Sequence, residues 1–181
     1  MQEIMIDLET LNTRPDSVIL TIGAVKFNSH DTGIIDRFYM KPDVDEQLDL
    51  GRSVDESTIE WWSKQNQEAR EEAFSVSGRT SYKDSIASLA KFCWNSSRVW
   101  SNGASFDIVL VEHAMSQLEI VFPWRHWEIR DTRTLWDVTG VKLTDNGNVT
   151  LHKADVDAEK QALAVQRSYK VLLKHGLGRA I

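Results

Sequence analysis

Three β-rich segments near the N-terminus constrain the fold more than any other feature of the sequence. Residues 3–7 form a short apolar run that ends in an acid, and residues 17–27 are rich in β-branched side chains, which favour strands. The turn-rich hexapeptide 28–33 leads into a third apolar run over residues 34–40. The second and third runs are therefore expected to pair as a hairpin.

Helical patterns alternate with short strands over the rest of the chain. Helices are expected at 55–65, 81–94, 105–118, 131–138 and 155–174, and strands at 98–101 and 127–130. Residues 140–153 are typical of a loop, with a turn at 145–148. A hairpin followed by strand–helix alternation implies an α/β fold with a mixed sheet and helices packed on it. Because the sequence has no repeat or linker, a single domain over 1–181 is expected.

The first chemical motif is a pair of acids, Asp7 and Glu9, at the end of the first predicted strand. Side chains alternate between the faces of a strand, so these two point the same way and Leu8 points the opposite way. Two anions held this close repel each other and call for a cation, and Mg²⁺ or Mn²⁺ suits ligands that are all oxygen. Solvated acid pairs are also common at strand ends, so the pair alone leaves both interpretations open.

Two further motifs lie in the second half of the chain. Asp107 follows a strand, a glycine turn and an aromatic residue, in the first turn of a predicted helix, where an acid also complements the helix dipole. His152 ends the predicted loop, and Asp157 follows five positions later at the start of the last helix. Asp155 and Glu159 are further acids in that stretch, and Asp155 also suits a helix cap.

Together these motifs resemble the DEDDh class of 3′-5′ exonucleases, the DnaQ-like, ribonuclease-H-like group that includes proofreading subunits, ribonuclease T and oligoribonuclease. The first motif of that class, Asp-x-Glu-Thr, stands at residues 7–10. The second, an Asp after a small-residue turn and an aromatic, stands at 102–107, and the third, a His followed by four residues and an Asp, stands at 152–157. A sister class has Tyr four residues before the last Asp, where this chain has Lys153.

The resemblance covers nearly the whole chain, and residues 21–27 and 61–65 are most similar to small phage-type exodeoxyribonucleases and related short exoribonucleases. It implies a ribonuclease-H-like three-layer fold with a mixed five-stranded sheet flanked by helices. It also implies hydrolysis from the 3′ end of single-stranded nucleic acid, with release of nucleoside 5′-monophosphates. DNA is the favoured substrate and RNA the alternative. A homodimer is a further expectation, because several short relatives form one.

The resemblance also implies a role for each motif residue around two divalent ions, Mg²⁺ or Mn²⁺. Asp7 is expected to bridge both ions, Glu9 and Asp157 to bind the ion that holds the attacking water, and Asp107 to support the second ion. His152 is expected to take the proton from that water, because histidine exchanges protons near neutral pH. Its place on a loop predicts that it swings in when substrate is bound.

Substrate contacts are expected next to these motifs. The resemblance places Thr10 and Leu11 against the terminal sugar and base, and Asn102 and Phe106 are further candidates. Three arginines are candidate phosphate contacts: Arg14, Arg130 and Arg133.

Two adjacent tryptophans add a possible stacking platform. Trp61 and Trp62 point about 100° apart on a helix, and Ile59 is taken to mark its core face. This predicts a buried Trp62 and a freer Trp61, which would stack on a base. The alternative is that both are partly buried packing residues.

The charge and cysteine content bound the remaining possibilities. A net charge of −6 argues against a long basic groove for nucleic acid, although a metal-dependent nuclease recruits phosphate through its ions. The single cysteine, Cys93, excludes an internal disulfide, fits a reducing compartment and is expected to be buried in a helix. The N-terminus has no secretory signal pattern and no apolar run is long enough for a membrane span, so a cytoplasmic protein without a membrane partner is expected.

Two alternatives to an exonuclease remain open from the sequence. A non-catalytic nucleic-acid-binding module on the same fold is disfavoured because all five motif residues are retained: Asp7, Glu9, Asp107, His152 and Asp157. A ribonuclease-H-type endonuclease is disfavoured by the third-motif histidine together with the first-motif acid pair.

Overall fold

The β-branched run that the sequence marks as a strand lies near the middle of the sheet. The structure, a computed structural model, describes residues 2–143 and 152–177, so the turn expected at 145–148 lies outside the described residues. In the described part, one sheet has the strand order β4-β3-β2-β1-β5-β6. Its strands are β1 (Glu3–Thr10), β2 (Ile19–Phe27), β3 (Ile34–Pro42), β4 (Arg79–Thr80), β5 (Arg98–Ser101) and β6 (Ile129–Asp131).

The pairing of the strands makes this a mixed sheet. β1 pairs with β2 and β2 with β3 in antiparallel fashion, which confirms the predicted hairpin. β1 pairs with β5, and β5 with β6, in parallel. The described residues contain six strands rather than the expected five, because the two-residue β4 pairs with the end of β3. The Arg79 guanidinium fixes this extra strand by donating to the carbonyl oxygens of Leu20 and Pro42.

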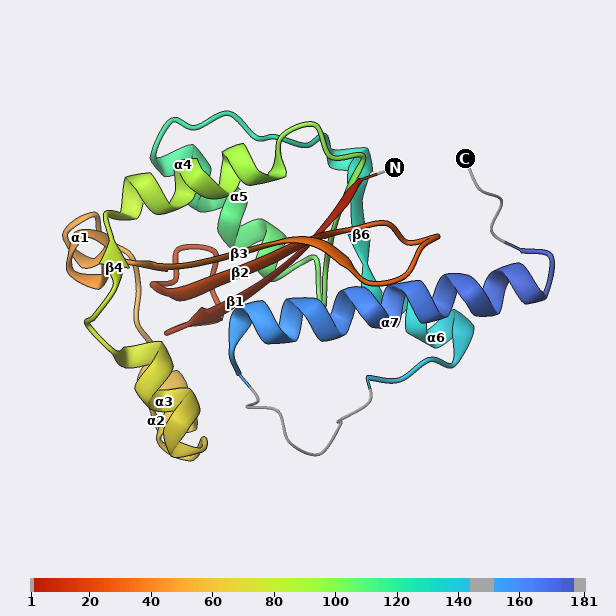
Figure 1. The fold of residues 1–181 in the computed structure, drawn as a ribbon. Coiled ribbons are helices and arrows are strands. Elements are labelled where there is room, and N and C mark those ends of the chain that lie inside the picture. Colours follow the sequence, from red (N-terminus) through yellow and green to blue (C-terminus); the bar gives the residue numbers. More distant parts are fainter. Residues whose placement is uncertain (1, 144–151, 178–181) are drawn as a thin grey trace.

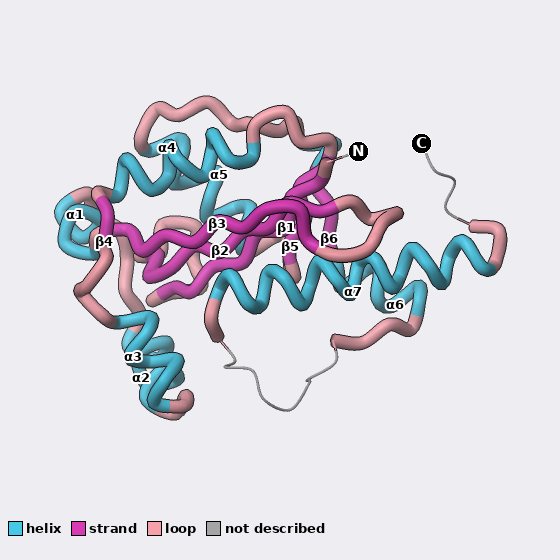
Figure 2. Tube along the Cα trace, viewed as in Figure 1, coloured by secondary structure: helices cyan, strands magenta, loops and turns pink. Residues whose placement is uncertain are grey.

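Helices cover both faces of the sheet, which confirms the three-layer architecture (Figures 1 and 2). The long α7 crosses β1, β2 and β3 on one face with α6 beside it, while α4 and α5 cover the other. The short α1, α2 and α3 lie beyond the end of the sheet at which β1 terminates. The helices are α1 (Val44–Asp49), α2 (Glu56–Ser63), α3 (Gln67–Phe74), α4 (Tyr82–Cys93), α5 (Asp107–Gln117), α6 (Thr132–Thr139) and α7 (Ala154–Lys174).

Apolar side chains fill the space between these layers. The larger cluster joins one face of the sheet to α4 and α5, and it includes Cys93, which is buried in α4 as predicted. The second cluster joins the opposite face to α7 through Ala158, Ala162 and Val165. Among the described residues, no helix combines the length and the apolar character that a membrane span needs.

Side-chain caps explain most helix starts among the described residues, but two helices, α5 and α7, begin without one. Asp55, Ser81 and Asp131 accept backbone N–H bonds at the starts of α2, α4 and α6. The helix expected to start at residue 105 begins instead at Asp107, after Phe106, without a side-chain cap. The predicted cap at Asp155 is wrong, because this residue already lies in the first turn of α7. The strand expected at 127–130 starts later, after a 3-10 turn at His126–Glu128.

Candidate active site

The pocket at the end of β1 collects the sequence-predicted acids. Its volume is about 450 Å³, and it is lined by Asp7 and Glu9 from β1, Asp107 from α5 and Asp157 from α7, together with His152. Because residues two apart on a strand share a face, Asp7 and Glu9 reach the same pocket.

Asp107 reaches the pocket because β1 and β5 separate before β1 ends. The two strands pair only over Glu3–Met5 of β1, so the N–H of Leu8 has no partner in β5. The carboxylate of Asp107 takes its place, with 3.2 Å from Leu8 N to Asp107 Oδ1. This bond ties the start of α5 to β1 and holds Asp107 beside the first-motif acids.

The start of α7 lies against β2 at a glycine. A Cβ at Gly23 would lie 2.1 Å from the carbonyl carbon of Ala154, a separation that no side chain tolerates. Gly23 is the register partner of Asp7 in the β1–β2 pair. The close approach therefore places Asp157, one turn into α7, next to the acids of β1.

His152 lies just before α7 and contacts Asp157 through its backbone. His152 N donates to Asp157 Oδ2 at 2.9 Å. Glu9, His152 and Asp157 each offer a ligand atom within 4.8 Å of the other two. The ring of His152 also contacts Trp61 edge to face, with 4.9 Å between the ring centroids. The predicted proton acceptor thus lies beside the acids in the structure itself.

Burial and nearby negative charge make the charged forms of Asp7, Glu9 and Asp107 costly. Burial, followed by the charges of Asp107 and Glu9, raises the pKa of Asp7 well above its ordinary value, and a hydrogen bond from Gln161 opposes this rise. Burial, followed by the charges of Asp157 and Asp107, raises the pKa of Glu9 from 4.5 to about 8. Burial also raises the pKa of Asp107 to about 7. Such shifts indicate that the cluster needs a compensating positive charge.

The residues present fit divalent cations. The four carboxylates supply the oxygen ligands that Mg²⁺ and Mn²⁺ prefer, in a pocket that is open to solvent on one side. The cationic groups that line the pocket are few. Lys160 Nζ lies 3.3 Å from Asp157 Oδ1. The guanidinium of Arg133 lies next to Gly103, and Arg133 lines the same pocket as the acids.

A second pocket of about 430 Å³ adjoins the first and shares Leu8, Glu9, Trp61 and Phe106 with it. Besides the shared Glu9, four hydroxyl-bearing residues line it: Thr10, Thr13, Ser57 and Thr58. The structure therefore brings three predicted substrate contacts, Thr10, Phe106 and Trp61, to the edge of the acid cluster.

Two other predicted substrate contacts have different surroundings. Asn102 lines the acid pocket, but its Oδ1 accepts from Arg133 Nε at 3.2 Å, so it orients an arginine. Leu11 is buried in a small core cluster with Trp62 and lines neither of the two pockets.

The two tryptophans of α2 differ as predicted, although the reason given was wrong. Trp62 is 1% exposed and its Nε1 donates to Thr10 O at 2.9 Å, whereas Trp61 is 42% exposed. Ile59, taken to mark the core face, is itself largely exposed. The buried partners of Trp62 come instead from α3, from β2 and from the segment that joins β1 to β2, which the helix pattern does not reveal.

Gln161 is a site residue that the sequence analysis missed. It lines the acid pocket from α7, and its Nε2 donates to Asp7 Oδ1 at 2.7 Å. Its spacing of four residues from Asp157 puts it on the same helix face. That spacing is the signal by which the sequence could have identified it.

Comparisons with known proteins place the chain among 3′-5′ exonucleases. A family model described as the 3′-5′ exoribonuclease Rv2179c-like domain matches residues 2–169. An exodeoxyribonuclease of Enterobacteria phage T4 is 26% identical over 165 residues, which cover 74% of this chain and 70% of the phage protein.

Solved structures of E. coli Exonuclease I share the fold. The complex with a dT13 oligonucleotide has a TM-score of 0.70 at 12% identity and is matched by 97% of this chain. The zinc-bound complex with single-stranded DNA has a TM-score of 0.66 at 14% identity and is matched by 96% of it. The chain spans only 42% and 43% of those two proteins, so the likeness establishes the ribonuclease-H-like fold alone.

Proposed function

The chain belongs to the Rv2179c-like 3′-5′ exoribonuclease domain family, and from this membership and the geometry of the pocket we propose that it is a metal-dependent 3′-5′ exonuclease. The reaction is hydrolysis of the terminal phosphodiester bond of a single-stranded nucleic acid, which releases a nucleoside 5′-monophosphate. The observation that carries this proposal is the convergence of four carboxylates and one histidine on a single pocket: Asp7, Glu9, Asp107, Asp157 and His152.

Each residue has a role that follows from its place in the pocket. The four carboxylates would hold two divalent cations. When bound, these cations would lower the pKa of the attacking water and stabilise the leaving 3′ oxygen. His152 accepts the proton of that water, because its ring lies beside Glu9 and Asp157. Lys160 and Arg133 line the same pocket and are placed to contact the phosphate.

The adjoining pocket suits the terminal nucleoside. Trp61 and Phe106 offer aromatic surface on which a base of any sequence can stack. The hydroxyl groups around them offer hydrogen bonds to the sugar. Leu11 is left out of this proposal because it does not line the pocket.

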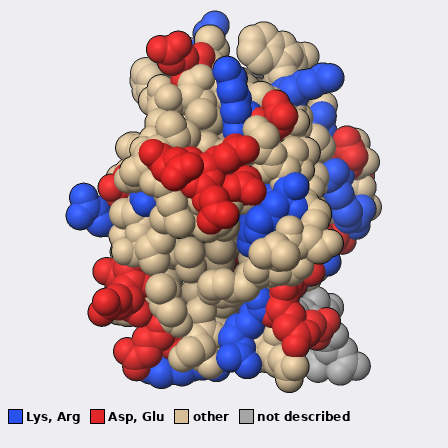
Figure 3. Space-filling model, turned by 90° about the vertical axis from the view of Figure 1, so that its left-hand side faces the viewer, with Lys and Arg blue, Asp and Glu red and all other residues tan. Residues whose placement is uncertain are grey.

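The surface charge supports a short footprint on the substrate. Figure 3 shows acidic side chains gathered in the middle of the face that carries α1, where three acids are exposed: Asp45, Glu46 and Asp49. Basic side chains lie beside this patch, so the face offers no continuous basic groove to a phosphate backbone. The substrate is therefore held mainly at its 3′ end, through the cations and the aromatic pocket.

Single-stranded DNA is the proposed substrate, and RNA is the second candidate. The phage relative is named an exodeoxyribonuclease, and the two structural neighbours described above are complexes with a dT13 oligonucleotide and with single-stranded DNA. The description of the family, an exoribonuclease domain, favours RNA instead. Contacts to the 2′-OH decide between the two. The homodimer expected from the resemblance stays a prediction.

Matched 5′-labelled oligonucleotides test the proposal. We expect single-stranded DNA to shorten from its 3′ end with Mg²⁺ or Mn²⁺, and to stay intact with EDTA. Matched RNA and duplex substrates rank the preferences. A clean Asp7→Asn protein should be inactive at every metal concentration, and appreciable residual cleavage by it would refute the two-cation site.

A 3′-blocked substrate separates the alternatives. An exonuclease leaves this oligonucleotide intact, whereas an endonuclease cuts it internally. A protein that binds single strands but cleaves none of the substrates would be a non-catalytic binding module.

A further inference from the structure

Gln161 occupies an unusual position for an uncharged polar residue. It lies on α7 one turn after Asp157, is only 4% exposed, and lines the pocket with the four acids. Burying a primary amide costs free energy unless its donor and acceptor groups are both satisfied.

The donor side of this amide is satisfied by Asp7. The distance from Gln161 Nε2 to Asp7 Oδ1 is 2.7 Å, which makes a direct polar link between α7 and β1. This bond also fixes the orientation of the amide, because the reverse orientation would point Oε1 at a carboxylate oxygen. The bond thereby restrains the orientation of the Asp7 carboxylate.

The acceptor side of the amide is unsatisfied. Gln161 Oε1 is buried and has no hydrogen-bond partner among residues 2–143 and 152–177. A buried amide oxygen without a donor costs roughly 1–3 kcal/mol. Because Gln161 Oε1 lies in a pocket lined by candidate cation ligands, its missing hydrogen-bond donor is expected to arrive together with a bound cation.

We propose that Gln161 is a positioning residue that orients Asp7 for cation binding and whose Oε1 accepts a hydrogen bond from a water that enters with the cation. This inference rests on the proposed function, because it assumes that the acids bind divalent cations. It assigns Gln161 to the site through Asp7, and not through contact with the substrate.

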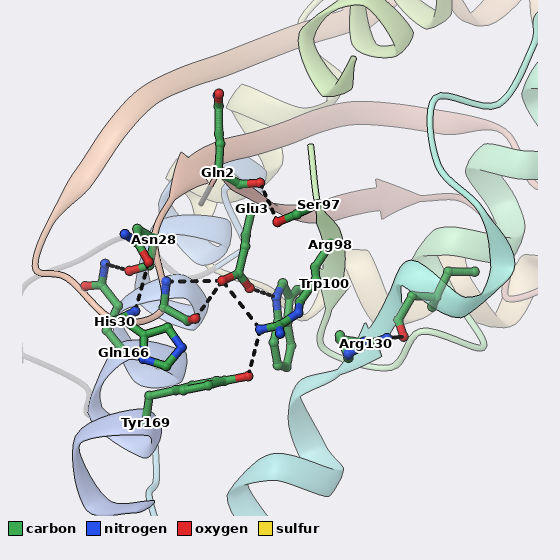
Figure 4. Close-up of polar contacts among 12 residues, drawn as sticks. Gln2, Glu3, Asn28, His30, Ser97, Arg98, Trp100, Arg130, Gln166 and Tyr169 are labelled. Carbon is green, nitrogen blue, oxygen red and sulfur yellow. Dashed lines mark hydrogen bonds and ion pairs between the residues drawn. The ribbon is translucent and has the colours of Figure 1, made fainter. Parts of the chain in front are cut away.

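Gln166 shows what a purely structural glutamine looks like on the same helix. It is equally buried, and its amide is fully satisfied by the turn between β2 and β3. Figure 4 shows Gln166 beside Asn28 at this turn. Its Nε2 donates to Asn28 O at 3.0 Å and to Gly33 O at 2.9 Å, and its Oε1 accepts from Gly33 N at 3.1 Å. Gln166 therefore serves as a matched control for Gln161.

The test compares Gln161→Leu with Gln166→Leu in the full chain. Three quantities are measured: Mn²⁺ affinity by titration calorimetry, kcat and KM on the oligonucleotide, and the melting temperature without metal. For Gln161→Leu we expect Mn²⁺ affinity and kcat to fall by about 10- to 100-fold, as for other residues that orient metal ligands. KM and the metal-free melting temperature should change little.

The control should show the reverse pattern. Gln166→Leu loses three hydrogen bonds to the hairpin, so its melting temperature should fall while Mn²⁺ affinity and kcat stay close to wild type. Should Gln161→Leu fail to fold, Gln161→Met, which keeps the unbranched shape, replaces it in every measurement.

Wild-type Mn²⁺ affinity in a folded Gln161 variant would overturn the proposal, and so would a melting temperature that falls as far as in the control. The affinity measurement does not depend on turnover. If the wild-type chain binds Mn²⁺ but cleaves nothing, the proposed function fails while the role of Gln161 is still decided.

Discussion

His152 adopts a left-handed backbone conformation, with φ of 64°, which costs a residue with a Cβ roughly 1–2 kcal/mol. Two contacts hold it there: its N–H donates to Asp157 Oδ2, and its ring packs against Trp61. Strain that the surroundings support in this way is typical of a functional position. The structure thus places the imidazole beside the acids, and its movement on substrate binding stays a prediction.

We expect His152→Ala to lower kcat by about 10²- to 10⁴-fold, the usual effect of losing a general base. Mn²⁺ affinity should change little, because the backbone N–H that bonds to Asp157 remains in the variant. Calorimetry with Mn²⁺ and steady-state kinetics measure the two effects. If affinity collapses together with kcat, His152 is a metal ligand and its role as proton acceptor is wrong.

Trp61 contacts both the imidazole and the nucleoside pocket, and the two contacts predict different kinetics. Loss of base stacking raises KM, whereas loss of support for His152 lowers kcat. We expect Trp61→Ala to lower kcat by about tenfold or more, because His152 loses its packing partner. A misplacement of a catalytic group by about 1 Å lowers the rate by on the order of 100-fold. Trp61→Phe should recover most of the loss, since it keeps an aromatic ring.

Trp94 provides the control for this variant. It is 65% exposed and lies at the end of α4, away from both pockets. Trp94→Ala should leave both constants unchanged. A Trp61→Ala protein with raised KM and wild-type kcat would show that Trp61 only stacks on the substrate.

The close approach between β2 and α7 decides where the third motif lies. Gly23→Ala would place a Cβ within 2.2 Å of the backbone of Ala154 and Asp155, so the first turn of α7 must move. Asp157 lies on that turn, and we expect kcat to fall by more than the stability loss explains. Overpacking of this kind costs typically about 1–3 kcal/mol of folding free energy, which a denaturation curve measures.

Gly78→Ala separates loss of stability from displacement of the site. A Cβ there meets no atom within 4 Å, but φ is 75°, so the substitution is strained in its own backbone. It should lower stability by roughly 1–2 kcal/mol and leave kcat unchanged. Equal kcat values for the two variants would mean that α7 is not positioned by Gly23.

The helices and strands that the sequence predicted are those whose formation depends on residues within the same segment. β-branched runs marked β2 and β3, and β5 begins and ends where expected, at Arg98 and Ser101. α1, α3 and β4 were missed because their support is tertiary. In α1, for example, the buried Gln47 bonds to the N–H and the carbonyl of Ile19 in β2, a contact that no periodicity reveals.

The same distinction holds for the site. Asp7 and Glu9 follow from strand alternation, and Asp107, His152 and Asp157 follow from the resemblance to the exonuclease motifs. The structure brings all five to one pocket, and their catalytic roles stay predictions. Gln161 lines the pocket because of how α7 packs on the sheet, and Leu11 is buried because of how α2 packs there. Local sequence patterns do not encode either packing.

The molecule carries buried acid at both ends of β1, and the two ends are balanced differently. Glu3 is fully buried and satisfied by Ser29 Oγ and Trp100 Nε1, each at 2.6 Å, with Arg98 at 3.7 Å (Figure 4). At the other end, Asp7 has one amide donor, from Gln161. The charge of Glu3 is therefore neutralised within the chain by Arg98, whereas the acids around Asp7 need positive charge from a bound cation.

This imbalance predicts how stability depends on pH and metal. In the folded chain burial raises the pKa of Glu9 to about 8 and that of Asp107 to about 7, so both still bind protons that the unfolded chain has released. Their contribution to stability is therefore full below about pH 4 and is lost as pH rises through about 7 to 8. Divalent cations bind the ionised carboxylates and should offset this loss.

We expect the metal-free melting temperature to fall between about pH 5 and pH 8, and Mn²⁺ to raise it most at the upper end. Asp107→Asn is the matched variant, because its amide oxygen still accepts from Leu8 N but carries no charge. Its melting temperature should depend less on pH and gain less from Mn²⁺. A wild-type melting temperature that is flat over this range, or equally raised by Mn²⁺ at both ends, would show that the acids of the pocket are already neutralised within the chain.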